Sequence, residues 1–252
     1  MSELQEAVRA RYADRALKMA ETPASCCDTA TSTCGDGYSA EELASVGISS
    51  TASLGCGNPT LLADLHPGEH VLDLGSGAGL DVLLSAKRVS PGGQAYGVDM
   101  TDEMLAVARE NQRKAAVANA TFLKGTIEQI PLPDAAVDVV ISNCVINLAA
   151  DKGAVLREAF RVLKPNGRLA VADMVAIDEL APEVKKRLDL WAGCIAGTIS
   201  IDEYTTALAN AGFTGIDVEV TRELHLDGVQ GRVASAYVRA RKPAPVVAES
   251  CC

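Results

Sequence analysis

Three separated cysteines have the most distinctive chemistry in this sequence. Cys56 lies between two glycines just before a predicted helix, Cys144 ends an apolar run, and Cys194 lies near the only tryptophan. A single cysteine of this kind is most often a small buried hydrophobic residue, and the sequence offers no C-x-x-C pair for a structural zinc site. If the three thiols converged on one pocket, they would instead suit a soft, three-coordinate centre.

The other cysteines lie near the two ends of the chain, as Cys26, Cys27, Cys34, Cys251 and Cys252. Adjacent cysteines form a disulfide only with strain, so these pairs indicate reduced thiols suited to soft-metal or redox chemistry. The N-terminal residues are charged throughout and lack a signal-peptide core, and no apolar run reaches the length of about 18 residues that predicts a membrane helix. We therefore expect a cytoplasmic protein with no membrane partner and mostly reduced cysteines.

The stretch VLDLGSGAGLD, residues 71–81, is a second chemical pattern. Its alternate glycines, from Gly75 to Gly79, would let the backbone turn sharply between a strand and a helix and approach a ligand closely. Asp99 ends the next predicted strand, where a carboxylate can accept hydrogen bonds from ribose hydroxyls. Asp73 would repel a pyrophosphate at this turn, and it would suit a ligand that carries an ammonium or sulfonium group.

An alternation of strands and helices would position these residues. Apolar runs predict five strands, at residues 70–75, 94–100, 120–125, 137–143 and 168–176. Helical patterns separate them, including one at 152–164, which predicts a parallel sheet covered on both faces. Alternating residues at 215–226 and 233–242 predict a closing hairpin. We expect an α/β fold with a doubly wound, mostly parallel, seven-stranded sheet.

Further helices are predicted at residues 1–20 and 180–211. Helix starts are marked by residues that favour N-caps or the first helical turn: Ser39 with Glu42, Asn58 with Pro59, Thr101, and Ser200 with Glu203. These helices would add a cysteine-containing annex to the sheet.

The glycine-rich stretch, with a strand before it and a helix after it, resembles the first motif of class I S-adenosylmethionine-dependent methyltransferases. The resemblance extends over residues 68–175 and implies a Rossmann-like sheet with S-adenosylmethionine as cofactor. Asp73 and the glycine turn would hold the amino-acid end of the cofactor, Asp99 its ribose, and Met100 one face of its adenine. The cofactor-binding residues that the resemblance implies are Asp73, Gly75, Ser76, Gly77, Gly79, Asp99, Met100, Thr126, Ile127, Glu128 and Asn143.

The fold does not identify the methyl acceptor. Methyltransferases that act on amino groups of bases or of glutamine carry a Pro-Pro-aromatic stretch after the fourth strand, where this chain reads NCVI from Asn143. Together with a net charge of −10, this argues against nucleic-acid and amide-nitrogen acceptors. An oxygen acceptor usually needs a general base such as histidine, but His66, His70 and His225 lie in no motif.

The cysteine-containing stretches narrow the resemblance further. SLGCGNP, VLDLGSGAGLD, ISNCVINL and WAGCIAG, in this order, resemble stretches of the arsenite methyltransferases, with similarity over residues 38–242. This resemblance implies that Cys144 and Cys194 bind trivalent arsenic, with Cys56 as a further thiolate. It also implies an additional thiol near the N-terminus, for which all three cysteines there remain candidates. The role of the C-terminal pair stays open.

The resemblance implies a cytoplasmic enzyme of arsenic detoxification that transfers methyl groups from S-adenosylmethionine to thiol-bound arsenite. Glutathione or thioredoxin would serve as thiol reductant, and the partners would be arsenite and methylated arsenicals, including thiol conjugates, with the protein a monomer. Two alternatives remain open. One is a small-molecule C- or O-methyltransferase with structural cysteines, and the other is a non-catalytic soft-metal-binding protein.

We expect four segments along the chain. A helix and a mobile cysteine-containing loop occupy residues 1–38, and the cofactor-binding core occupies 39–178. An arsenic-binding helical annex with the closing strands occupies 179–242, and a flexible Cys-Cys tail occupies 243–252.

Overall fold

A seven-stranded sheet organises the protein. The computed structural model describes residues 3–21, 37–48, 55–185, 187–191, 194–224 and 231–245. The strands are β1 (His70–Leu74), β2 (Gln94–Asp99), β3 (Ala120–Lys124), β4 (Val137–Asn143), β5 (Leu163–Ala176), β6 (Thr214–Leu224) and β7 (Val233–Arg241). Their order is β3-β2-β1-β4-β5-β7-β6, in which β1 to β5 run parallel and β7 is antiparallel to both of its neighbours. The predicted α/β fold and closing hairpin are confirmed.

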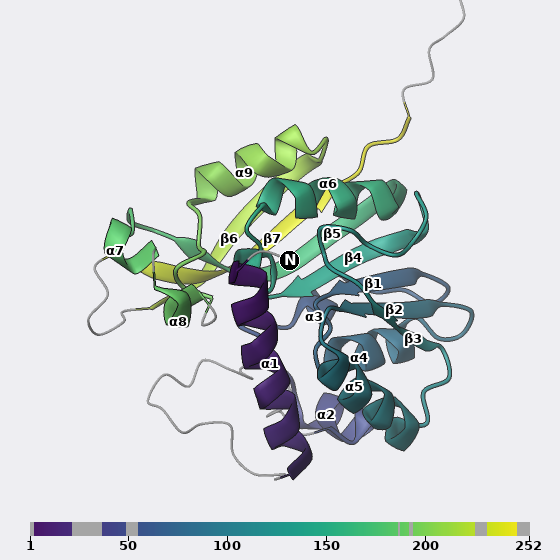
Figure 1. The fold of residues 1–252 in the computed structure, drawn as a ribbon. Coiled ribbons are helices and arrows are strands. Elements are labelled where there is room, and N and C mark those ends of the chain that lie inside the picture. The colour runs from purple at the N-terminus through teal and green to yellow at the C-terminus, as the bar shows by residue number, and fades with distance from the viewer. Residues whose placement is uncertain are drawn as a thin grey trace, which may run out of the picture.

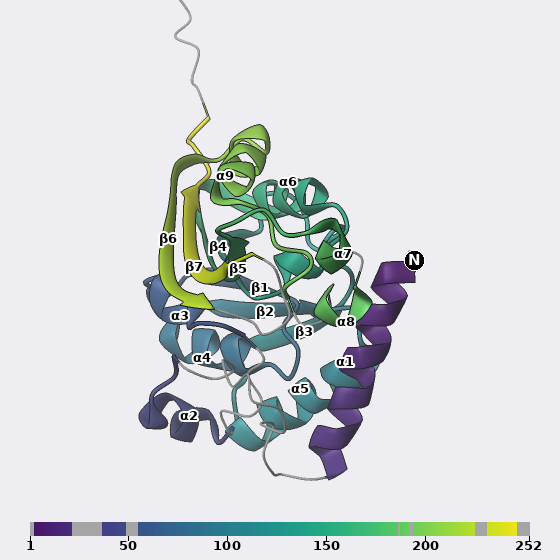
Figure 2. The ribbon, with the colours of Figure 1, turned by 90° about the vertical axis from the view of Figure 1, so that its left-hand side faces the viewer.

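Helices cover both faces of this sheet (Figures 1 and 2). They are α1 (Glu3–Glu21), α2 (Ala40–Val46), α3 (Pro59–Leu62), α4 (Leu80–Arg88), α5 (Asp102–Ala115), the 3-10 helix η2 (Ile146–Leu148), α6 (Lys152–Val162), α7 (Pro182–Lys185), α8 (Leu188–Trp191) and α9 (Ile201–Asn210). Figure 2 shows α6 and α9 on one face, with α3 and α4 on the other. The long α1 contacts α5 and α8. None of the helices in the described ranges is long and apolar enough to span a membrane.

The central strands are apolar because helices cover both of their faces. Residues of β1 and β4 such as Leu72, Leu74 and Val140 are fully buried, and they pack in one core with Leu156 of α6 and Tyr204 of α9. Burial of such side chains stabilises the fold by about 1.5–3 kcal/mol each. This core fixes the ends of β1 and β4, which carry the residues that could do chemistry.

Most of the predicted helix starts are present. Capping boxes begin α2 at Ser39 and α9 at Ser200, and the side chain of Asn58 accepts a hydrogen bond from the Leu61 N–H at the start of α3. Thr101 occupies the N-cap of α5, but its side chain makes no capping hydrogen bond.

Two boundary predictions are wrong. The helix predicted at 152–164 ends at Val162, and β5 starts at Leu163, because Asn166 N donates to Lys242 O and Lys242 N donates to Gly167 O. These bonds draw residues 165–167, between the predicted helix and the predicted strand, into the sheet as a bulge.

The predicted helical stretch at 180–211 is divided among α7, α8 and α9. Residues before α9 are held extended, since Ala176 N donates to Ile199 O and Ala176 bridges Ser200. A tertiary backbone contact thus overrides the helical pattern.

Candidate active site

A cavity opens where the parallel strands end, and about 1020 Å³ in and around it, including space open to solvent, holds no protein atoms. This is where ligands bind in open α/β sheets. Of the residues implied as cofactor-binding, the structure places these around the cavity: Asp73, Gly75, Ser76, Gly77, Asp99, Met100, Thr126, Ile127, Glu128 and Asn143. Gly79 lies behind the wall, where a Cβ would come within 2.7 Å of Phe122. Its role is to let the helix pack closely.

The turn between β1 and α4 needs glycine for two different reasons. Gly75 and Gly77 have φ of +67° and +49°, in the left-handed region. A Cβ on Gly75 would lie 2.5 Å from Val145, so the backbone there touches the neighbouring loop. A Cβ on Gly77 would meet nothing within 4 Å, because this residue faces the cavity. Gly77 therefore leaves a space that a ligand can fill.

Three carboxyl groups make the cavity strongly acidic. Asp99 accepts hydrogen bonds from Gly77 N at 2.9 Å and Thr101 N at 2.8 Å. Burial raises the pKa of Asp99, raises that of Asp81 to about 6, and raises that of Asp73 well above its ordinary value, helped by the charges of the other two groups. A cationic occupant would lower this electrostatic cost.

These features fit S-adenosylmethionine, which carries an ammonium and a sulfonium group. The buried hydroxyl of Ser76 has no hydrogen-bond partner within the described part of the chain, although it lines the cavity. Such a group is expected to bind a ligand or a water molecule. The unpaired Ser76 hydroxyl, the three carboxyl groups and the open space at Gly77 are therefore all consistent with a cationic ligand such as S-adenosylmethionine.

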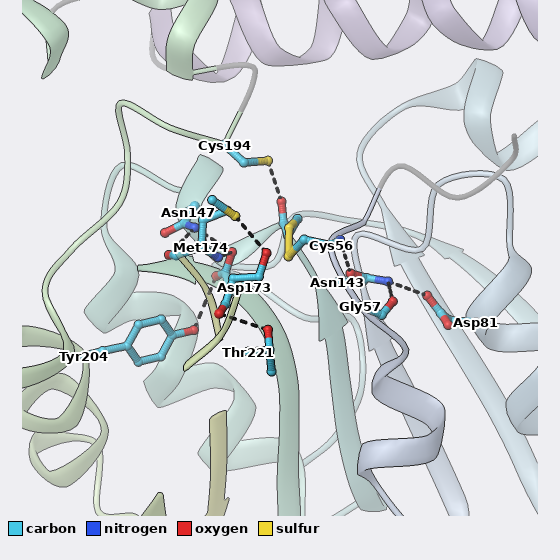
Figure 3. The surroundings of a disulfide bond; sticks show 12 residues. Cys56, Gly57, Asp81, Asn143, Asn147, Asp173, Met174, Cys194, Tyr204 and Thr221 are labelled. Carbon is cyan, nitrogen blue, oxygen red and sulfur yellow. Dashed lines mark hydrogen bonds between the residues drawn. A yellow bond between two sulfur atoms is a disulfide. The ribbon is translucent and has the colours of Figure 1, made fainter. Parts of the chain in front are cut away.

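The three cysteines lie close together. Figure 3 shows Cys194 near the disulfide of Cys56. Cys144 lines the cavity and is joined to Cys56 by a disulfide, with their Cα atoms 6.2 Å apart. Cys194 is buried, and its Sγ donates a hydrogen bond to Cys144 O at 3.0 Å. We predicted mostly reduced cysteines, and Cys56 and Cys144 depart from this because the fold brings their sulfur atoms within bonding reach.

The histidines at the start of β1 do not line the cavity. His66 precedes β1 and His70 begins it, at the opposite end of the strand from the cavity. His225 and the five cysteines near the chain ends lie outside the described residues.

Several residues of the site were missed in the sequence. Gln5, Val8 and Tyr12 of α1 line the cavity, and Gln5 Nε2 donates to Glu128 Oε1 at 3.2 Å. In the sequence, the only indication that this helix contacts the rest of the protein was its apolar face. Asp81 also lines the cavity. Its position inside the glycine-rich stretch gave a signal that could have found it.

Comparison with known proteins agrees with this geometry. A model of the methyltransferase domain family matches residues 65–212. An arsenite methyltransferase of Halobacterium salinarum is 42% identical over 230 residues, which cover 87% of this chain and 59% of that protein. The crystal structure of an arsenic(III) S-adenosylmethionine methyltransferase from Chlamydomonas reinhardtii matches with a TM-score of 0.66 and 33% identity, over 76% of this chain and 68% of that chain. This chain belongs to the arsenite methyltransferase family.

The chain spans little more than half the length of the arsenite methyltransferases that it matches. The chain spans 59% of the Halobacterium relative and 53% of the arsenite methyltransferase of Mus musculus, which is 35% identical over 198 residues. Residues 65–212, which match the methyltransferase domain model, contain the five parallel strands β1 to β5 and the glycine-rich turn. The fold is therefore that of class I S-adenosylmethionine-dependent methyltransferases.

Proposed function

We propose that this protein transfers methyl groups from S-adenosylmethionine to trivalent arsenic bound by Cys56, Cys144 and Cys194. The observation that carries this proposal is the convergence of these cysteines on the edge of an acidic cavity that Cys144 itself lines. Arsenite and methylated arsenicals, including their thiol conjugates, are the proposed substrates. The names of the two relatives above support the same acceptor.

The cavity would hold the cofactor in one orientation. Asp73 and the glycine turn would bind its amino-acid end, Asp99 would accept hydrogen bonds from the ribose, and Met100 and Ile127 would pack against the adenine. When bound there, S-adenosylmethionine supplies an electrophilic methyl group on its sulfonium. Cys144 lies on the wall of the same cavity, so a thiolate-bound atom can face that methyl group.

The disulfide must open before arsenic can bind. Two molecules of an external thiol such as glutathione, or the dithiol of thioredoxin, would reduce Cys56–Cys144 to two thiols and be oxidised to a disulfide. Thiols bind soft metals and metalloids as thiolates, so arsenic binding releases protons. Three thiolates would leave the arsenic lone pair free to attack the methyl carbon.

This reaction needs no general base, because the nucleophile is a lone pair and not an N–H or O–H group. Catalysis by this chain is then mostly positioning, which can lower a barrier by about 7–11 kcal/mol. The placement of His66 and His70 at the far end of β1 agrees with such a mechanism. We propose that the protein acts as a monomer in the cytoplasm.

Methylation assays with native protein and Cys144→Ser test this function. With arsenite, S-adenosylmethionine and glutathione, native protein should form methylated arsenic, and Cys144→Ser should be slower by at least about 100-fold because one arsenic ligand is lost. The affinity for S-adenosylhomocysteine, measured by calorimetry, should stay within about threefold, which controls for folding.

Three outcomes would contradict the proposal. Full activity of Cys144→Ser would make this residue a packing group. Methylation of a carbon or oxygen acceptor that survives thiol alkylation would favour a small-molecule methyltransferase. Stoichiometric arsenic binding without turnover would favour a soft-metal-binding protein.

A further inference from the structure

One amide side chain binds the backbone at Cys56 and at the next residue, Gly57. Asn143 ends β4, directly before Cys144. Its Oδ1 accepts from Cys56 N at 2.9 Å, and its Nδ2 donates to Gly57 O at 2.8 Å (Figure 3). The amide orientation is fixed, since an N–H needs an acceptor and a carbonyl needs a donor. The loop that carries Cys56 is thus attached to the strand that carries Cys144.

The glycines on either side of Cys56 make this attachment possible. A Cβ on Gly55 would lie 1.9–2.2 Å from the amide atoms of Asn143. A Cβ on Gly57 would lie 2.8 Å from Ala172 and from the Tyr237 ring. A side chain at Gly55 would push the loop away from Asn143, and one at Gly57 would push it away from β5 and β7. The two glycines therefore let the loop that carries Cys56 lie close to the sheet.

A second layer of groups orients the Asn143 amide. Tyr38 donates its hydroxyl hydrogen to Asp81 Oδ1 at 2.7 Å. Asn143 Nδ2 donates to the Tyr38 hydroxyl at 3.0 Å and lies 3.4 Å from Asp81 Oδ2. This network occupies the polar atoms of the amide with partners from three separate segments. Asn143 is consequently held in one rotamer before any ligand arrives.

We infer that Asn143 is a positioning residue that keeps Cys56 beside Cys144 when their disulfide is reduced. Neither backbone bond from Asn143 uses a sulfur atom, so both can persist after the S–S bond opens. The reduced thiols then stay close enough to bind one arsenic atom together. This purpose rests on the proposed function, but the effect on the thiol pair itself does not.

The equilibrium between disulfide and dithiol measures this role without arsenic or cofactor. Two glutathione molecules convert Cys56–S–S–Cys144 into two thiols and glutathione disulfide, passing two electrons and two protons to the protein. In the reduced form of Asn143→Ala, neither hydrogen bond holds the loop that carries Cys56. In the oxidised form, the disulfide still holds this loop beside Cys144. We expect the equilibrium constant to move about tenfold toward the dithiol, or about 30 mV, for the loss of two backbone hydrogen bonds.

Asn119→Ala is the matched control. The Asn119 amide also donates two backbone hydrogen bonds, to Ala86 O and Gly93 O, at the other end of the sheet. Its removal should leave the equilibrium within about twofold. Differential alkylation with peptide mass mapping would follow the Cys56–Cys144 pair alone among the eight cysteines.

Asn143→Asp provides a variant of the same shape. It keeps an acceptor for Cys56 N but loses the donor to Gly57 O, so its equilibrium should move in the same direction as that of Asn143→Ala. If the alanine variant does not fold, the aspartate variant decides. Native-like equilibria in the folded variants would overturn the inference, and they would leave the methylation proposal standing on its own test.

Discussion

At the scale of single residues, Asp173 is a buried acid outside the cavity. It lies near the end of β5, fully buried, and accepts hydrogen bonds from Asn147 Nδ2 at 2.6 Å and from Met174 N at 2.9 Å. The Tyr204 hydroxyl donates to its other oxygen at 3.4 Å. Burial raises the pKa of Asp173 to about 7, although these bonds and the charge of Lys152 favour the ionised form.

The raised pKa of Asp173 predicts a pH-dependent stability. Between its ordinary value of 3.8 and about 7, the folded protein binds more protons at this site than the unfolded chain, so stability falls as pH rises. Asp173→Asn should remove this contribution. From about pH 4 to about pH 8, native protein should lose roughly 2–4 kcal/mol more unfolding free energy than the variant. Urea unfolding at several pH values measures this, and parallel pH profiles would contradict it.

Residue-scale chemistry was only partly visible in the sequence. Asp73 and Asp99 stood out because they bracket a recognisable turn, and both line the cavity. The partners of Asn143 could not be predicted, since they depend on a loop that approaches β4 from 86 residues away in the chain. Hydrogen bonds of this kind follow from the folded backbone and not from local pattern.

At the scale of elements, a glycine in the β1–α4 turn lets the effect of backbone strain be distinguished from the effect on ligand binding. Gly77 and Gly47 both have positive φ, +49° and +65°, and a Cβ would meet nothing within 4 Å at either residue. Gly77 faces the cavity, whereas Gly47 forms the C-cap of α2. The two glycines therefore provide a matched pair.

Alanine at each position should cost about 1–2 kcal/mol of unfolding free energy, because both backbones are left-handed. Only Gly77→Ala places a methyl group in the cavity. It should weaken S-adenosylhomocysteine binding about tenfold in calorimetry, as expected when extra volume enters a fitted site. Gly47→Ala should bind as native protein does. Equal affinities in the two variants would show that the cavity wall at Gly77 does not contact the cofactor.

Elements with a strong pattern were predicted well, and those set by tertiary contacts were not. The five parallel strands and the hairpin were evident because burial on both faces, or on alternate residues, leaves a clear pattern. The position of α1 at the cavity was not, since its buried residues, such as Val8 and Ala16, show only that it packs on something. The broken helical stretch at 180–211 was decided by the backbone contact of Ala176.

At the scale of the whole molecule, the fold brings distant cysteines to one end of the parallel strands. Cys56 precedes β1, Cys144 follows β4, and Cys194 lies between β5 and β6. Because β4 and β5 are neighbours, the segments that follow their carboxyl ends can bring Cys144 and Cys194 together. Cys56 lies before β1 and is held beside Cys144 by the hydrogen bonds of Asn143. The spacing of the cysteines along the chain does not predict this arrangement. Their place in the site came from the family resemblance.

The number of sulfur atoms around bound arsenic tests the central claim most directly. X-ray absorption would count them in the reduced protein, with Cys26, Cys27, Cys34, Cys251 and Cys252 replaced by serine and one equivalent of arsenite added. We predict three sulfur neighbours, from Cys56, Cys144 and Cys194, and two after the further change Cys194→Ser. An unchanged sulfur count in the Cys194→Ser protein, or no arsenic binding to the reduced chain, would contradict the account.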